Sequence, residues 1–302
     1  MKIVYSDRYN VDIGDHVFPT EKYALTRQLL TRAHHISSDC FIRPQSASDK
    51  DILRIHAPEY IHKLKQGSLT LQEIARLEVP YSTDLMEAAW LCAGGTLISC
   101  RYALDDGISA HIGGGFHHAF PDHGEGFCVL NDVAIALAAL LDESAISRPV
   151  VIDCDVHQGN GTAFIFQGNP DVFTFSIHQR DNYPFAKIPS DLDVELDDGT
   201  GDREYIRHLH RALDIITTAH QPDFALYIAG ADPFYGDVLG GLALSLEGLE
   251  ERDVSVFAYC RKHKIPCAVV LGGGYAASVE TTAQIHCNTI KTACEASGGK
   301  PQ

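Results

Sequence analysis

Residues 149–161 read PVVIDCDVHQGNG, a strongly apolar run that ends in two aspartates and a histidine. Alternate residues of a β-strand share one face, so Asp153, Asp155 and His157 are expected to project together. Buried carboxylates are costly unless they are paired or coordinate a cation. The segment therefore predicts the end of a buried strand that carries either a metal site or a network of salt bridges.

Three later apolar runs have the same character: DVFTFSIH at 171–178, DFALYIAG at 223–230 and PCAVVLGG at 266–273. Segments with helical periodicity, notably residues 202–220 and 246–263, lie between the runs. Continuous apolar strands that alternate with helices are typical of a parallel sheet covered on both faces. Right-handed crossovers place the helices on both sides of such a sheet.

The first half of the chain has a less regular pattern. It predicts strands at 2–6 and near 108–114, helices at 21–33, 49–64 and 83–104, and a helix capped by Asn131. No linker, internal repeat or charge block divides the chain. We therefore predict a single α/β domain over residues 1–302, with a central, mostly parallel β-sheet and helices on both faces.

Polar and glycine-rich residues follow the other expected strands, and ligand sites in open α/β sheets form at this position. Asp232 follows the third apolar run and can complete a ligand set with Asp155 and His157. Two carboxylates and one imidazole leave positions for water and substrate, as in catalytic zinc sites, and such a set also accepts Fe²⁺. Read alone, Asp232 before Pro233 is also typical of the start of a helix.

Two further groups of residues indicate proton transfer and oxyanion binding. HIGGGFHHAFPDHGEGF, at 111–127, sets the tandem His117 and His118 directly after a glycine-rich turn. Histidine moves protons near neutral pH, and glycines let substrate and backbone approach closely. Tyr275 ends the run GGGY, where its hydroxyl can donate a hydrogen bond to a developing oxyanion. Taken alone, each pattern also occurs at ordinary surface positions.

The composition disfavours several classes of function. Lys and Arg number 24 against 40 Asp and Glu, a formal charge of −16, so we expect no direct nucleic-acid binding. The longest apolar run, residues 133–141, is less than half as long as the roughly 20 residues of a membrane span. The start, MKIVYSDRYN, turns polar after four residues, so we expect no secretory signal. Nine cysteines without a CxxC pair favour reduced core thiols in a cytoplasmic protein over a disulfide framework.

At these residues the sequence resembles the zinc-dependent histone deacetylase family, which has the arginase–deacetylase fold. Five separated motifs carry the resemblance: VYS-RYN near the N-terminus, GGGFHH, DxDxHQGNG, AG-D-GD-LGGL and GGY. They extend from residue 3 to residue 288, and their pattern is closest to class IV of the family. Bacterial acetoin-utilisation and acetylpolyamine amidohydrolase proteins share the core motifs.

The resemblance implies four kinds of site residue. The implied metal ligands, for Zn²⁺ or Fe²⁺, are Asp155, His157 and Asp232. The implied catalytic residues are the proton-transfer pair His117 and His118, the oxyanion donor Tyr275, Asp153 behind His117, and Asn160 behind His118. The implied substrate contacts are Gly126, Phe127, Gly273 and Gly274, with the Phe127 ring along an acyl-lysine channel. A structural K⁺ site would use the side chains of Asp153 and Ser176 and the carbonyl oxygens of Asp155, His157 and Ile177.

Asn160 stands where class I members of the family have an aspartate. A neutral amide stabilises an imidazolium less than a carboxylate does. We therefore predict that His118 stays neutral near pH 7 and acts as the base, whereas His117, backed by Asp153, is more often protonated. In residues 77–82, Glu78 is the only acidic residue that can match the rim residue which grips the substrate backbone in some relatives.

The resemblance implies metal-dependent hydrolysis of Nε-acyl-lysine in a protein or peptide, and class IV likeness favours long acyl chains. An acylated polyamine or another small amide is the alternative substrate, and an acyl-lysine or metal-binding module without activity is the alternative class. A ureohydrolase of this fold would need a carboxylate two residues after His157, where Gly159 stands. The substrate, the native metal and the oligomeric state stay open.

Five other histidines receive no role, although Asp15 and His16 match a loop near the channel mouth of relatives. These histidines are His16, His34, His35, His123 and His286.

Overall fold

The structure, a computed structural model, describes residues 1–34 and 36–298 and contains one eight-stranded β-sheet. The strand order is β2-β1-β3-β8-β7-β4-β5-β6, and all neighbours in this sheet are parallel. The predicted α/β class is confirmed, with a sheet that is parallel throughout. The strands are β1 (Ile3–Val4), β2 (Phe41–Ile42), β3 (Ile108–His111), β4 (Pro149–Asp153), β5 (Phe173–Gln179), β6 (Leu192–Leu196), β7 (Phe224–Ile228) and β8 (Cys267–Val270).

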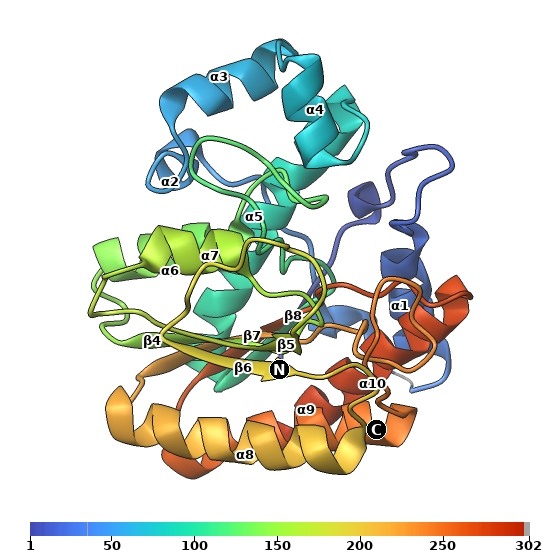
Figure 1. Cartoon of the computed structure of the whole chain (residues 1–302), viewed down its shortest axis with the longest axis vertical. Coiled ribbons are helices and arrows are strands. Elements are labelled where there is room, and N and C mark those ends of the chain that lie inside the picture. The colour runs from blue at the N-terminus through green and yellow to red at the C-terminus, as the bar shows by residue number, and fades with distance from the viewer. Residues whose placement is uncertain (35, 299–302) are drawn as a thin grey trace.

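Helices cover both faces of the sheet (Figure 1). Helices α1, α8, α9 and α10 pack on one face, and α5, α6 and α7 pack on the other. The short helices α2, α3 and α4 lie at one end of the molecule, beyond α5 and α6. The helices are α1 (Glu21–Arg32), α2 (Asp49–Ile52), α3 (Pro58–Gln66), α4 (Leu71–Leu77), α5 (Thr83–Asp106), α6 (Asp132–Asp142), α7 (Asn160–Phe166), α8 (Asp202–Ala219), α9 (Leu246–His263) and α10 (Val279–Ala296), with 3-10 turns at Asp7–Tyr9 and Ser38–Cys40.

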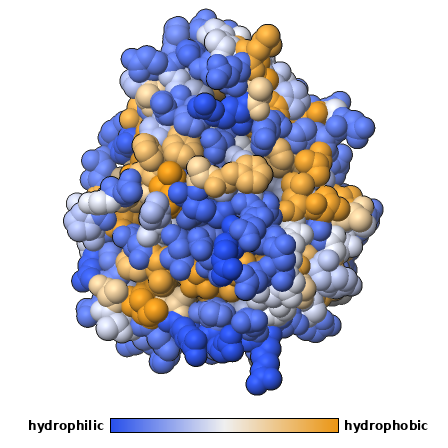
Figure 2. Space-filling model, viewed as in Figure 1, coloured by the Kyte–Doolittle hydropathy of each residue, from blue (hydrophilic) through white to orange (hydrophobic). Residues whose placement is uncertain are grey.

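The central strands β4, β7 and β8 are largely apolar because both faces of the sheet are buried there. On β4, Val150 and Ile152 join the core cluster that includes residues of α8, α9 and α10, whereas Val151 joins the cluster under α5 and α6. All five residues of β7 are fully buried. Hydrophilic residues predominate on the face seen in Figure 2, with hydrophobic residues in separate patches. The sheet also buries polar side chains within its strands, including Ser109 on β3 and Ser176 on β5.

Two predicted elements end earlier than expected. The helix expected at 49–64 is interrupted, because α2 ends at Ile52 and α3 begins at Pro58. Proline lacks an N–H and restricts the residue before it, so it starts a helix more readily than it continues one. The strand expected to carry Asp155 ends at Asp153, whose carboxylate accepts the Asp155 N–H at 3.1 Å. A side chain thus takes a backbone donor that the sheet would otherwise have used.

The cysteines of the chain are free thiols. All nine cysteines lie in the described part of the chain; none forms a disulfide, and seven are buried. Within residues 1–34 and 36–298, no helix has both the length and the apolar character needed to cross a membrane. His35 and residues 299–302 of the predicted domain lie outside the described residues.

Candidate active site

The segments after β4 and β7 bring together the three predicted ligands. One ligand atom from each of Asp155, His157 and Asp232 lies within 4.8 Å of the others, and all three residues are buried. His157 Nδ1 is 3.0 Å from Asp155 Oδ1 and 3.3 Å from Asp232 Oδ2. The Val156 N–H donates to Asp232 Oδ1 at 2.9 Å, but Asp232 Oδ2 has no hydrogen-bond partner among the described residues. A buried, unpartnered carboxylate oxygen beside an imidazole nitrogen fits a cation-binding set.

The alternative interpretation of Asp232 as a helix cap is wrong, because the chain forms a turn after this residue and not a helix. Its carboxylate is directed to the Val156 N–H and to the cluster. The Ala-Asp-Pro sequence is locally compatible with either role. The packing of β7 against β4 decided between them.

Interactions within the cluster favour a positive charge between its two carboxylates. Burial alone would lower the pKa of His157, but Asp155 and Asp232 raise it to about 10. Burial and the neighbouring Asp155 raise the pKa of Asp232 to about 7. Burial alone would raise the pKa of Asp155, but His117 and His157 hold it below its ordinary value. A divalent cation can supply the positive charge that this arrangement requires.

Two glycines let the backbone approach the cluster closely. A Cβ atom at Gly230 would lie 2.5 Å from Asp155 Cα, and one at Gly273 would lie 1.9 Å from Asp232 Oδ2. Gly273 also has a φ of +34°, which L-residues rarely adopt. The glycine-rich turn after β8 is therefore required by the space around Asp232.

Two histidines, each with a polar partner, stand beside the cluster. His117 Nδ1 is 2.7 Å from Asp153 Oδ2, and His118 Nδ1 is 2.7 Å from Asn160 Oδ1. The Nε2 atoms of His117 and His118 face each other at 3.1 Å. Burial alone would lower the pKa of His117, but Asp153 and Asp155 raise it to about 9. Burial and the neighbouring His117 lower the pKa of His118.

The turn before the histidines is held by the first residue of α6. Asp132 accepts hydrogen bonds from the N–H groups of Gly115, at 3.1 Å, and Phe116, at 2.8 Å. A Cβ atom at Gly114 would lie 2.6 Å from Asp132 Oδ2, so the turn needs glycine there. Asn131 caps α6 as predicted, through Ala134 N at 2.9 Å. Asp132 thus orients the segment that carries His117 and His118.

Tyr275 faces the cluster from the turn after β8. Its N–H donates to Asp237 Oδ2 at 2.6 Å, and its ring centroid is 6.4 Å from that of His157. Burial and the carboxylate of Asp232 raise the pKa of Tyr275, so its hydroxyl stays protonated. A protonated phenol at this position can donate a hydrogen bond toward the cluster.

Lys22 is a functional candidate that the sequence analysis missed. The residue is fully buried, its Nζ donates to the carbonyl oxygen of Gly273, and it lies 5.4 Å from the Tyr275 ring centroid. Burial lowers its pKa to about 8. Helical spacing could have found it, because Lys22 shares the buried stripe of α1 with Thr26 and Leu30, each four residues apart.

A cavity that opens to the surface borders His118, His157 and Tyr275. Two aromatic side chains, Phe127 and Tyr183, also line it, and the Tyr183 ring centroid is 4.9 Å from that of His118. Phe127 was predicted to line an acyl-lysine channel, whereas Tyr183 was missed. The sequence signal that could have indicated Tyr183 is an aromatic residue a few positions after the strand predicted at 171–178.

The remaining predicted contacts have different positions. Gly126 and Gly273 line the pocket around the cluster, but Gly274 does not, and its Cβ position faces Thr282. Glu78 lines the larger cavity, and its backbone oxygen is 2.7 Å from His16 Nε2. His16, which received no role, also packs its ring edge-on against Phe127, as its match to a mouth loop suggested.

The side chains expected to hold K⁺ lie on neighbouring strands. Asp153 on β4 pairs in register with Ser176 on β5. Asp153 also accepts hydrogen bonds from His117 and from Asp155 N, and Ser176 Oγ is 2.9 Å from His178 Nδ1. The structure thus brings together the two side chains predicted to bind K⁺, and each of them forms a hydrogen bond within the protein.

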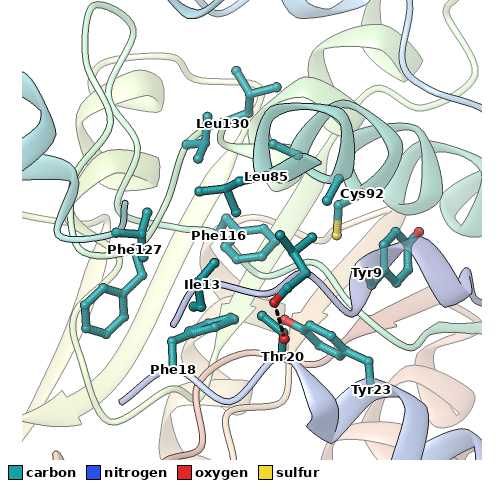
Figure 3. Close-up of a pocket in the computed structure, with 15 residues that line it drawn as sticks. Tyr9, Ile13, Phe18, Thr20, Tyr23, Leu85, Cys92, Phe116, Phe127 and Leu130 are labelled. Atoms are coloured by element: carbon teal, nitrogen blue, oxygen red, sulfur yellow. Dashed lines mark hydrogen bonds between the residues drawn. The ribbon is translucent and has the colours of Figure 1, made fainter. Parts of the chain in front are cut away.

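A second cavity adjoins the pocket around the cluster and is lined mainly by apolar side chains (Figure 3). Phe18, Phe116 and Phe127 line both spaces. The other walls come from the N-terminal segment and from α5, including Ile13 and Leu85. No sequence pattern indicated this cavity, because segments distant in the chain enclose it.

Comparison with known proteins gives concordant similarities. A family model described as the histone deacetylase domain matches residues 16–292. An uncharacterized protein of Picosynechococcus sp. is 38% identical over 285 residues, which cover 94% of this chain and 95% of that protein. Histone deacetylase 2 of Arabidopsis thaliana is 30% identical over 305 residues, covering 96% and 78%. The acetoin utilization protein AcuC of Bacillus subtilis is 28% identical over 300 residues, covering 90% and 76%.

Proposed function

The chain belongs to the histone deacetylase family, and from that premise we propose that it hydrolyses the amide bond of Nε-acyl-lysine in a protein or peptide. One observation carries the proposal: a carboxylate–imidazole cluster, two facing imidazoles and a protonated phenol border one buried pocket. We also propose that residues 1–302 form a single catalytic domain, because the family match spans both halves of the sheet.

The proposed metal is Zn²⁺, with Fe²⁺ as the second candidate, held by Asp155, His157 and Asp232. The unpartnered Asp232 Oδ2 and the donor chemistry of this set support the assignment. When bound, such a cation polarises an amide carbonyl and lowers the pKa of water. The proposed K⁺ site comprises Asp153, Ser176 and the carbonyl oxygens of Asp155, His157 and Ile177.

The paired histidines are proposed to move the protons. His118, whose pKa burial lowers, is neutral and accepts a proton from the attacking water at Nε2. His117, whose pKa is raised to about 9 despite its burial by its contact with Asp153, holds a positive charge beside it. A protonated histidine of the pair then donates to the leaving lysine amine, which is too basic to depart unprotonated.

Other residues are proposed to position the substrate. The Tyr275 hydroxyl donates to the oxygen of the tetrahedral intermediate, where negative charge develops. The Gly126 carbonyl accepts the substrate amide N–H, and Phe127 and Tyr183 flank the lysine chain. The cavity that contains these two rings also borders His118 and Tyr275, which supports this path.

The apolar cavity beside the pocket supports a preference for acyl groups longer than acetyl. Its wall residues Phe18, Phe116 and Phe127 also border the place where the acyl carbon must lie. Each buried methylene contributes about 0.8 kcal/mol of binding. A chain that reaches the cavity would therefore bind more tightly than an acetyl group.

A second candidate substrate is an acylated polyamine. Glu78 lines the cavity that also borders His118 and Tyr275. Its carboxylate can pair there with a second ammonium group of the polyamine. The ureohydrolase alternative is disfavoured, since a Cβ atom at Gly159 would lie 2.5 Å from Asp153 Oδ2. A carboxylate-bearing residue there would displace the partner of His117.

The test compares rates on acetyl-, octanoyl- and myristoyl-lysine peptides and on acetylputrescine, with Zn²⁺ or Fe²⁺ added to metal-free protein. We expect metal-dependent release of the carboxylic acid, which leaves an unmodified lysine side chain on the peptide, and a faster rate for octanoyl than for acetyl. Metal uptake measured by calorimetry without turnover of any substrate would instead identify a binding module. Turnover of acetylputrescine alone would transfer the assignment to polyamines.

A further inference from the structure

We infer that Glu125 is a positioning residue that fixes the tautomer of His118 through the side chain of Asn160. The inference rests on the proposed function, in which His118 accepts a proton at Nε2. Among the described residues, the side chain of Glu125 has Asn160 and His123 as its polar partners and forms no hydrogen bond or ion pair with the carboxylate–imidazole cluster or the paired histidines.

Three side chains form a directed chain of hydrogen bonds. Asn160 Nδ2 donates to Glu125 Oε1 at 2.9 Å, and Asn160 Oδ1 faces His118 Nδ1 at 2.7 Å. An ionised carboxylate can only accept hydrogen bonds, so Glu125 requires the NH₂ group of Asn160 on its side. The amide oxygen must then face His118, whose Nδ1 must carry the proton. The lone pair of the neutral ring is left on Nε2, the atom that lies 3.1 Å from His117 Nε2.

The ionised state of Glu125 is supported by its surroundings. Burial alone would raise the pKa of Glu125, but the neighbouring His123 imidazole and a hydrogen bond from Asn160 hold it below its ordinary value. His123 Nε2 lies 3.6 Å from Glu125 Oε2, and His123 Nδ1 is 2.7 Å from Asp122. The carboxylate therefore stays an acceptor when Asn160 donates to it.

The backbone of Glu125 is anchored by the turn that carries the channel wall. Glu125 N donates to Cys128 O at 3.1 Å, and Cys128 N donates to Glu125 O at 2.9 Å. Gly126 and Phe127 between them have φ values of +52° and +68°, which suit a tight hairpin turn. Phe127 N also donates to Leu77 O at 2.9 Å. One turn thus places both the aromatic wall and the acceptor that orients Asn160.

This arrangement gives Asn160 part of the role that a carboxylate would have. A free amide could face His118 with either its oxygen or its nitrogen, and only the first orientation leaves Nε2 basic. Glu125 removes the second orientation by accepting the amide N–H. His118 is thereby oriented by a neutral partner, without a second negative charge directly beside it.

The decisive test reverses the hydrogen-bond polarity at position 125. In Glu125→Lys, the new side chain only donates, so Asn160 turns its oxygen away and presents its NH₂ group to His118 Nδ1. Imidazole ¹⁵N spectra of Zn²⁺-loaded and metal-free protein, assigned with His118→Ala, should show the proton on Nδ1 in wild type and on Nε2 in the variant. We expect kcat to fall by about 100-fold, the scale of general-base catalysis, with little change in KM.

Further variants separate this role from a general loss of structure. Glu125→Gln accepts either amide orientation, so a smaller loss of kcat and a mixture of tautomers are expected. Asp122→Asn removes a neighbouring charge from an exposed side chain and should leave both kcat and the tautomer of His118 unchanged. Asn160→Asp combined with Glu125→Lys should restore the wild-type tautomer and most of kcat, because the introduced carboxylate accepts hydrogen bonds from both neighbours.

An Nδ1-protonated His118 in Glu125→Lys would overturn the inference, as would failure of the double variant to regain activity above the single variant. If wild type hydrolyses no amide, the proposed function fails, but the ¹⁵N spectra still decide whether Glu125 sets the tautomer. Turnover in wild type together with an unchanged tautomer in both Glu125 variants rejects the inference alone.

Discussion

Arg252, on α9, donates through Nη1 to the carbonyl oxygen of Gly230, two residues before Asp232. The same Nη1 atom is 3.4 Å from the carbonyl oxygen of Cys154, the residue before Asp155. One fully buried guanidinium therefore links the segments that carry both carboxylates of the cluster. Its charge is balanced by Asp253, at 2.9 Å from Nε.

Replacing Arg252 with methionine should weaken both the fold and the cation site. Breaking a buried ion pair costs about 3–5 kcal/mol, and loss of outer support for metal ligands typically costs about 10–100-fold in affinity. Urea unfolding measures the first effect and calorimetric Zn²⁺ titration the second. Wild-type Zn²⁺ affinity in a folded variant would contradict the linking role.

Replacing Tyr275 with phenylalanine tests the proposed oxyanion donor. The ring packing against Phe127 and His157 is retained, and only the hydroxyl is lost. Removal of one such donor costs about 10²–10³ in kcat. Steady-state rates on the best acyl-lysine peptide check this expectation, with Zn²⁺ affinity as the control. Full activity would remove Tyr275 from the mechanism.

Replacing Gly273 with alanine should abolish cation binding for steric reasons. The added Cβ would lie 1.9 Å from Asp232 Oδ2, so the turn or the carboxylate must move. Gly168→Ala is a matched control, because Gly168 also has a positive φ, of +78°, but has no atom within 4 Å of its Cβ position. We expect the control to lose about 1 kcal/mol of stability and keep its Zn²⁺ affinity. Equal Zn²⁺ affinities would contradict the steric explanation.

The stability of the fold should decrease in weak acid because of buried neutral histidines. Burial lowers the pKa of His111 from 6.5 to about 3 and that of His56 to about 4. Between these values and 6.5, the unfolded chain binds protons that the folded chain does not, so acid favours unfolding. Each group then removes about 1.4 kcal/mol of unfolding free energy per pH unit as the pH falls below 6.5. Urea unfolding at several pH values between 5 and 8 gives the unfolding free energy at each pH. Its decrease per pH unit toward acid should be smaller for His111→Asn than for wild type.

Filling the apolar cavity should separate long from short acyl substrates. Ala88, on α5, lines the cavity, and a phenylalanine there would project its ring into that space. We expect kcat/KM for octanoyl-lysine to fall by about tenfold or more, since several methylenes at about 0.8 kcal/mol each lose their site. The rate on acetyl-lysine is the internal control. An equal loss on both substrates would mean that the cavity does not hold the acyl chain.

Features that depend on local geometry were predictable from the sequence. The two-residue spacing of Asp153, Asp155 and His157 predicted that their side chains lie close together. They do so although the strand ends at Asp153, because the Asp155 N–H donates to Asp153 and the His157 N–H donates to Asp155. The apolar runs predicted a parallel sheet because only strands buried on both faces lack polar alternation. The break at Pro58 was also readable in the sequence and was missed.

Features that depend on contacts between distant segments were not predictable. Lys22 bonds to Gly273, 251 residues away, and Glu125 reaches Asn160 across 35 residues. The sequence by itself determined six of the eight strands, the family motifs and the residue types of the cluster, since these follow from short-range periodicity and residue type, whereas β2 and β6 were missed. Only the tertiary structure decided which carboxylate faces which amide, which lysine is buried and where an apolar cavity lies. Those properties arise when side chains from separate elements compete for the same space and the same hydrogen-bond partners.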